Sequence, residues 1–121
     1  MKNVGKTERT FDIDLEYGIA GENHVLGLLN GAMKVEVKTD RMAHSTGNLA
    51  VEYSSRGLPS GIATTKADYW AFVIGDNNTV IFIPTERLKE LARVWYKAGY
   101  IVDGGDQNTS KIILIPIKEI L

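Results

Sequence analysis

The stretch Met33-Lys34-Val35-Glu36-Val37-Lys38-Thr39-Asp40 decides the fold, because polar side chains take every second place in it. Alternation with a period of two is typical of a β-strand that has two unlike faces. Val35 and Val37 face one way, and we expect them to anchor the strand in the core. Glu36 and Lys38 face the other way. The sequence therefore predicts a strand over residues 33–40 with one charged face.

The segments around this strand predict an α/β protein, in which a mixed central sheet is flanked by helices. Before it, we expect a strand over residues 10–16 and a short helix over residues 19–30. After it, the same patterns predict further elements, which are strands over residues 48–55, 69–74, 79–83 and 111–117, a short helix over residues 62–68, and a helix that Thr85 caps and Gly99 ends.

Length and composition predict a single domain over residues 1–121 with one hydrophobic core. Hydrophobic residues make up 44% of the chain and charged residues 24%, as in ordinary globular proteins. No apolar run approaches the ~20 residues that span a bilayer, so we expect no membrane partner. The first residues lack the apolar stretch of a signal peptide, which favours the cytoplasm. The absence of cysteine excludes disulfides, zinc–thiolate sites and thiol nucleophiles.

The net charge of −1 and the pI of about 6.1 are not those of a generally basic protein. Strong nonspecific binding to nucleic acid draws on Lys and Arg, so the charge counts mildly against it. It does not exclude a nuclease, because acidic metal ligands lower the net charge and a bound divalent cation restores positive charge where phosphate sits.

Glu36 and Lys38 form the first pattern that carries chemistry. Residues two apart on a strand project from the same face, about 7 Å apart along the backbone. Phosphodiester hydrolysis needs a metal ion to neutralise charge at phosphorus and a group that orients water. A carboxylate and an ammonium group at this spacing can serve both needs. A solvated strand face also carries this pattern.

Glu52 adds to this pattern if residues 33–40 and 48–55 form an antiparallel hairpin. The hairpin would place Glu52 across from Glu36 or Val37, with Cβ atoms about 5 Å apart. Two carboxylates that close repel each other unless a cation lies between them, and a metal site supplies that cation. The alternative is a cross-strand ion pair of Glu52 with Lys34 or Lys38.

Glu22 is a third candidate, because its spacing to Leu26 and Leu29 puts it on the inward stripe of the predicted helix. Its alternative role is to stabilise the positive end of the helix dipole. Asp12 and Asp14 on the predicted first strand could also reach the site.

The loop from Tyr53 to Lys66 is rich in glycine and hydroxyl groups and carries two cations. Such groups are the usual donors to phosphate. The alternative interpretation of this loop is a flexible turn with an ordinary Ser/Thr helix cap. In this context we expect the loop to grip a DNA backbone through four residues, which are Arg56, Ser60, Thr64 and Lys66.

Together, the segment with Glu22, the strand Val35–Asp40 and the segment Thr46-Gly47-Asn48 with Glu52-Tyr53 resemble the PD-(D/E)xK nuclease superfamily. Small phage endonucleases and Holliday-junction resolvases belong to that superfamily. The resemblance covers about residues 10–75. It implies a restriction-endonuclease-like core and a Mg²⁺ or Mn²⁺ cofactor. It further implies that Glu36 and the Val37 carbonyl bind the metal, that Lys38 positions the attacking water, and that Glu22 matches the helix glutamate of several branches.

One departure from the family pattern concerns the Asp that precedes Glu-x-Lys, because no such residue lies between Gly31 and Lys34. Its role can fall to Asp14, Glu22 or Glu52. In another mapping, Glu36 takes the place of the Asp and Glu52 that of the Glu, with Lys38 acting from the neighbouring strand. A third possibility is that the chain has lost full nuclease activity.

The leading hypothesis is a metal-dependent endonuclease that cuts duplex or branched DNA as a homodimer, since two strands call for two sites. Glu22, Glu36 and Glu52 would supply metal ligands, and Lys38 would orient the water. The alternatives are a catalytically inactive nucleic-acid-binding module on the same fold, and a protein-interaction domain whose charged strand face is solvated.

Overall fold

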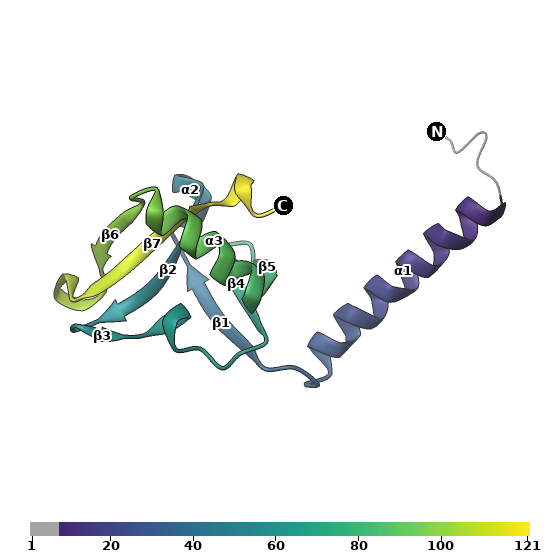
Figure 1. Cartoon of the computed structure of the whole chain (residues 1–121), viewed down its shortest axis with the longest axis horizontal. Coiled ribbons are helices and arrows are strands. Elements are labelled where there is room, and N and C mark those ends of the chain that lie inside the picture. Colours follow the sequence, from purple (N-terminus) through teal and green to yellow (C-terminus); the bar gives the residue numbers. More distant parts are fainter. Residues whose placement is uncertain (1–7) are drawn as a thin grey trace. The chain divides into compact units, whose positions relative to one another are not determined.

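The computed structural model describes the backbone of residues 8–121 and the side chains of residues 15–121. It confirms the α/β class, with helices and mixed strands (Figure 1). The chain divides into two units, one ending at Met33 and one formed by residues 34–121.

Helix α1 (Glu8–Leu29) occupies most of the first unit. The strand predicted over residues 10–16 is therefore wrong, and the helix predicted over residues 19–30 is the end of a longer one. The seven residues from Thr10 to Glu16 alternate between polar and apolar side chains, which by itself matches the pattern of a strand. The apolar residues Leu15, Ile19 and Leu26, however, continue in steps of four and seven, which is a helical repeat.

None of the helices within the described residues is long and apolar enough to cross a membrane.

The strands of the second unit form two sheets instead of the single central sheet expected. The first has the order β1-β4-β5, in which β1 (Val35–Asp40) runs parallel to β4 (Tyr69–Ile74) and β4 antiparallel to β5 (Thr79–Pro84). The second has the order β3-β2-β7-β6 and is antiparallel throughout. Its strands are β2 (Asn48–Ser55), β3 (Leu58–Pro59), β6 (Ile101–Gly104) and β7 (Ser110–Pro116).

Two helices and three 3₁₀ turns join these strands. They are α2 (Ala43–Thr46), α3 (Thr85–Lys97), η1 (Gly61–Ala63), η2 (Asp106–Asn108) and η3 (Ile117–Glu119). The helix predicted over residues 62–68 is wrong, because only the short turn η1 forms there. Thr85 does not cap α3 but is its first residue. Its hydroxyl donates to the Ala67 carbonyl at 2.8 Å and so serves the preceding loop.

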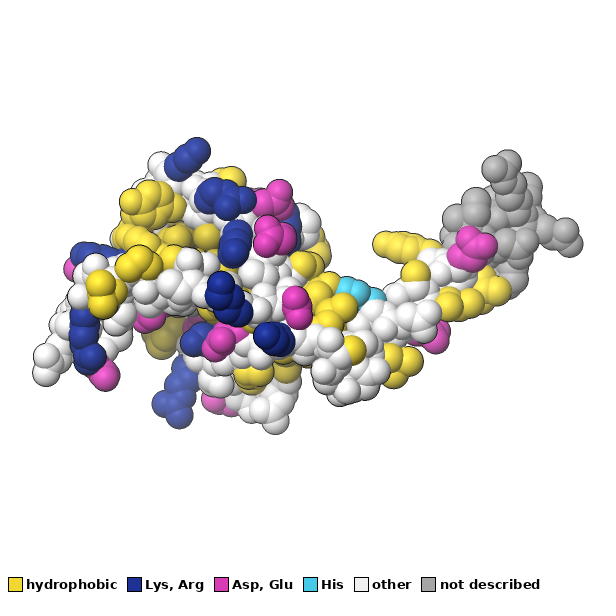
Figure 2. Space-filling model, turned by 60° about the horizontal axis from the view of Figure 1, so that its bottom comes forward, with side chains coloured by type: hydrophobic (Ala, Val, Ile, Leu, Met, Phe, Trp, Pro, Cys, Tyr) yellow, Lys and Arg dark blue, Asp and Glu magenta, His cyan; other side chains and the backbone are white. Residues whose placement is uncertain are grey.

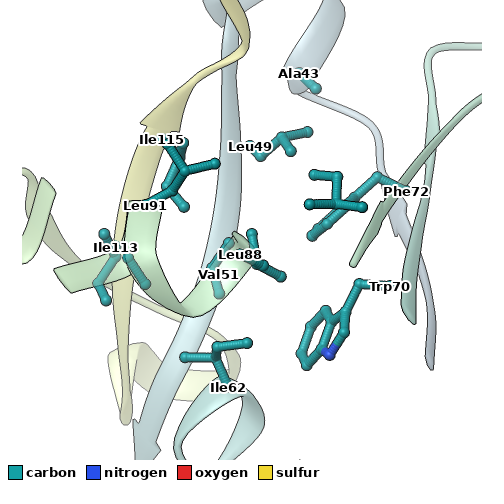
Figure 3. Packing of buried hydrophobic residues seen from close by; sticks show 12 residues of the cluster. Ala43, Leu49, Val51, Ile62, Trp70, Phe72, Leu88, Leu91, Ile113 and Ile115 are labelled. Atoms are coloured by element: carbon teal, nitrogen blue, oxygen red, sulfur yellow. The ribbon is translucent and has the colours of Figure 1, made fainter. Parts of the chain in front are cut away.

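Helix α3 packs its apolar stripe against both sheets, which makes one core in the second unit (Figure 3). Leu88 from α3, Trp70 and Phe72 from β4, and Leu49 and Val51 from β2 are at most 2% exposed. Because neighbours across a sheet share a face, the Cα pairs Glu36–Trp70 and Lys38–Phe72 place the charged face of β1 on the core side.

Val37 lies on the opposite face and is 60% exposed, so the prediction that it anchors β1 in the core is wrong. Val35 is half-buried. The register aligns Val37 with Ala71 and Phe82, and Phe82 is itself 43% exposed. The alternation of β1 is as predicted, but the charged face lies on the core side where the valine face was expected. The sequence does not say which side of the sheet the core covers.

Candidate active site

Glu36 and Lys38 lie together on the core-side face of β1, as the spacing predicted. The Lys38 Nζ atom is 3.4 Å from Glu36 Oε2. Their side chains remain 43% and 49% exposed, because β1 is the edge strand of its sheet. The two groups therefore form a solvent-accessible pair at the border of the core, where a soluble substrate can reach them.

Trp70 lies directly beside this pair and forms the apolar side of the site. The Lys38 Nζ atom sits 5.8 Å from the centroid of the indole ring, which is within cation–π distance. The ring is 2% exposed, and its Nε1–H has no hydrogen-bond partner among the described residues. Lys38 is thus held between one carboxylate and one aromatic face.

The Val37 carbonyl faces the unpaired edge of β1. Tyr69 N–H donates to the Lys34 carbonyl at 3.1 Å, which fixes the phase of the β1–β4 ladder. Along a parallel ladder, residues of one strand alternate between bonding their neighbour and facing away from it. Lys34 and Glu36 belong to the bonded set, and Val37 belongs to the other. Its carbonyl oxygen is therefore outside the β4 ladder.

Asp40 ties the end of β1 to the start of β2. Its Oδ1 atom accepts a hydrogen bond from Met42 N–H at 3.2 Å, and its Oδ2 atom accepts one from Ala50 N–H at 2.9 Å. Both strands adjoin α2 at this end (Figure 1). The carboxylate thus links the two sheets near the site.

We expect Asp40→Ala to lower the free energy of unfolding by about 2 kcal/mol, since it removes the charged acceptor of two backbone N–H groups. Urea denaturation followed by circular dichroism measures the loss. Asp76→Ala removes an exposed carboxylate from the turn after β4 and is the matched control. An equal loss in both variants would contradict the linking role of Asp40.

The hairpin predicted between residues 33–40 and 48–55 is wrong, because β1 and β2 belong to different sheets. The register sets Glu36 beside Trp70 and Glu52 beside Ile112. Glu52 instead accepts a hydrogen bond at its Oε2 atom from the Ser60 hydroxyl at 2.8 Å. The two glutamates therefore do not meet as cross-strand neighbours.

The other predicted ligands lie on α1, which belongs to the first unit. Glu22 is exposed there. Asp12 and Asp14 fall in α1 in place of the predicted strand, and their side chains lie outside the described residues. Among the side chains of residues 15–121, no three from His, Asp or Glu lie close enough together to hold a metal ion.

The loop residues predicted to grip DNA are spread along the chain between β2 and β4. Arg56 lies in the tight turn between β2 and β3 and has a φ of 51°. Ser60 is bound to Glu52, Thr64 ends η1, and Lys66 is exposed before β4. The loop is thus an ordered hairpin and turn, in which Ser60 positions a carboxylate.

The donors on β1 suit a hydrated Mg²⁺ or Mn²⁺ ion. Magnesium keeps several waters and is commonly held by one or two carboxylates together with substrate phosphates. Glu36 Oε2 pairs with Lys38, and the other Glu36 oxygen has no hydrogen bond or ion pair among the described residues. The Val37 carbonyl lies outside the ladder. These two donors would hold the ion, which would supply positive charge to a phosphate.

Helix α3 carries cations that the sequence-based site did not include. Lys89, Arg93 and Lys97 recur every four residues and so share one side of the helix. Lys and Arg side chains gather on the visible face of the second unit (Figure 2). The four-residue spacing is readable in the sequence and could have identified this row.

Comparison with family models, with characterised proteins and with solved structures found no match to this chain.

Proposed function

We propose that this protein is a Mg²⁺- or Mn²⁺-dependent endonuclease that hydrolyses DNA phosphodiester bonds on a restriction-endonuclease-like core. The observation that carries the proposal is the accessible pair of Glu36 and Lys38 on the edge strand β1, with the Val37 carbonyl outside the ladder between them. A carboxylate, a carbonyl and an ammonium group at this spacing supply what metal-assisted hydrolysis requires.

In this proposal each residue has one task. Glu36 and the Val37 carbonyl would hold the ion, and Lys38 would orient the attacking water toward phosphorus. Glu52 is proposed as a further ligand. Ser60 supports this for Glu52, because its hydroxyl fixes one carboxylate oxygen and leaves the other available. Hydrolysis proceeds without a covalent enzyme intermediate, since water is the nucleophile.

DNA is the proposed substrate, and the proposed assembly is a homodimer. The support for a dimer is geometrical. Cutting both strands of a duplex or of a branched junction calls for two sites related by symmetry, whereas one chain carries one Glu36–Lys38 pair.

The test combines metal binding with cleavage. Calorimetry should show Mn²⁺ binding to the wild-type protein, and Glu36→Ala should abolish it. Incubation with plasmid and four-way-junction DNA should give nicked or linear products in Mg²⁺ or Mn²⁺ and none with a chelator. Binding without any cleavage in either metal would overturn the proposal of an enzyme. It would favour the second candidate, a nucleic-acid-binding module without activity, which the cation row of α3 supports.

A further inference from the structure

A pocket lies beneath α3, apart from the Glu36–Lys38 pair. Its volume is about 350 Å³, near the lower end of the range for small-ligand pockets, ~300–1,000 Å³. Ala92 and Ile113 contribute apolar surface, and Ile62 closes it from η1. The size suits one small planar group.

The walls of this pocket combine aromatic rings with cations. Tyr53 and Tyr96 line it and contact each other edge to face, with ring centroids 5.4 Å apart. Lys89, Arg93 and Lys97 of α3 line it as well. Lys89 is 4.0 Å from Glu86, whereas Arg93 and Lys97 have no carboxylate within ion-pair distance among the described residues. Two positive charges at the rim are thus left for a ligand.

From this pocket we infer the substrate class of the proposed enzyme: the pocket under α3 binds one unpaired nucleotide of a single-stranded DNA segment. The base stacks against Tyr96, and Arg93 and Lys97 hold its phosphate. Stacking platforms beside a cationic groove are the usual means of binding single strands. An acidic peptide would satisfy the cations and leave the aromatic, apolar cavity unused. The inference rests on the proposed function, although the binding is measured without cleavage.

Two short segments connect the pocket to the Glu52–Ser60 hydrogen bond. Tyr53 follows Glu52 on β2, at the point where the β2–β7 register shifts. Ser60, which holds Glu52, is two residues before Ile62.

The test is fluorescence anisotropy of the full chain, in a chelator, with a labelled single strand of about 12 nucleotides and the matching duplex. We expect the single strand to bind more tightly than the duplex. The double variant Arg93→Ala with Lys97→Ala should weaken its binding at least about tenfold. The matched control removes two charges outside the pocket, as Arg87→Ala with Lys118→Ala. Tyr96→Leu should weaken binding about tenfold, and Tyr96→Phe should leave it unchanged.

Three results would overturn the inference. They are equal losses in the two double variants, tighter binding of the duplex, and displacement of the strand by polyglutamate at the same charge concentration. A thermal melt of each variant checks folding. Cleavage assays separate the two proposals. If the α3 variants cleave DNA at the wild-type rate, the nuclease proposal holds and the pocket has no part in cleavage. If the protein binds the single strand but does not cleave DNA, the pocket inference holds and the nuclease proposal fails.

Discussion

Replacing Lys38 by alanine is expected to lower the rate of Mg²⁺-dependent DNA cleavage at least about a hundredfold while the fold stays intact. A positioned group that orients or activates the reacting water is worth about 10²–10⁴ in rate. The effect on stability is small, because the Lys38–Glu36 pair is half exposed and such pairs contribute about 0–1 kcal/mol. Initial rates on supercoiled plasmid, measured beside a urea denaturation curve, separate the two effects.

The matched control for this variant is Lys34→Ala, which removes an exposed lysine just before the same strand. It should retain the wild-type rate to within about threefold, which is the scale of a weak, screened charge effect. Lys38→Arg keeps the positive charge and tests whether a planar guanidinium group can replace the ammonium group. Cleavage that persists unchanged in Lys38→Ala would place the chemistry elsewhere or show contamination.

Gly61→Ala is expected to cost at least about 3 kcal/mol of stability, the largest loss we predict for a single methyl group. Gly61 has a φ of 53°, a left-handed conformation that costs an L-residue about 1–2 kcal/mol. A methyl group there would also overlap the backbone carbonyl oxygen of Glu52. Relieving that overlap moves Ser60 away from the Glu52 carboxylate. Equilibrium denaturation measures the cost, and the cleavage rate should fall with it.

Gly57→Ala separates steric overlap from backbone strain. Gly57 also has a positive φ, 81°, but no atom outside its immediate neighbours lies within 4 Å of the position its methyl group would take. Its replacement should cost only about 1 kcal/mol. If both variants lose the same stability, the close approach of Gly61 to Glu52 has no energetic consequence and the proposed support of the carboxylate fails.

Local patterns predicted five strands of the second unit, missed β3 and β6, and gave β1 the wrong partner. The alternation of residues 33–40 identifies β1, because it holds over eight consecutive positions. The partner of β1 is residues 69–74, not the next strand along the chain, and no short-range pattern encodes that choice. The segment 10–16 failed for a related reason. Its alternation is too short to outweigh the helical repeat that continues to Leu29.

In the candidate site, too, the sequence predicted the local geometry and missed a tertiary contact. The spacing of Glu36 and Lys38 predicted a shared face, and the pair meets there at 3.4 Å. The bond between Ser60 and Glu52 was not predicted, although both residues had been singled out separately. It arises because the turn after β3 brings the chain back against β2, where Ser60 N–H donates to the Tyr53 carbonyl at 3.1 Å. Tertiary turns of this kind have no signature in the sequence.

The indole of Trp70 offers a built-in optical reporter of this region. The chain has two tryptophans, and Trp95 packs against Tyr100 instead, with centroids 4.7 Å apart. Because the Lys38 ammonium lies above the Trp70 ring, any ion or phosphate that draws the ammonium away alters the electric field on the chromophore. The emission of a Trp95→Phe variant therefore records occupancy of the edge strand without a label.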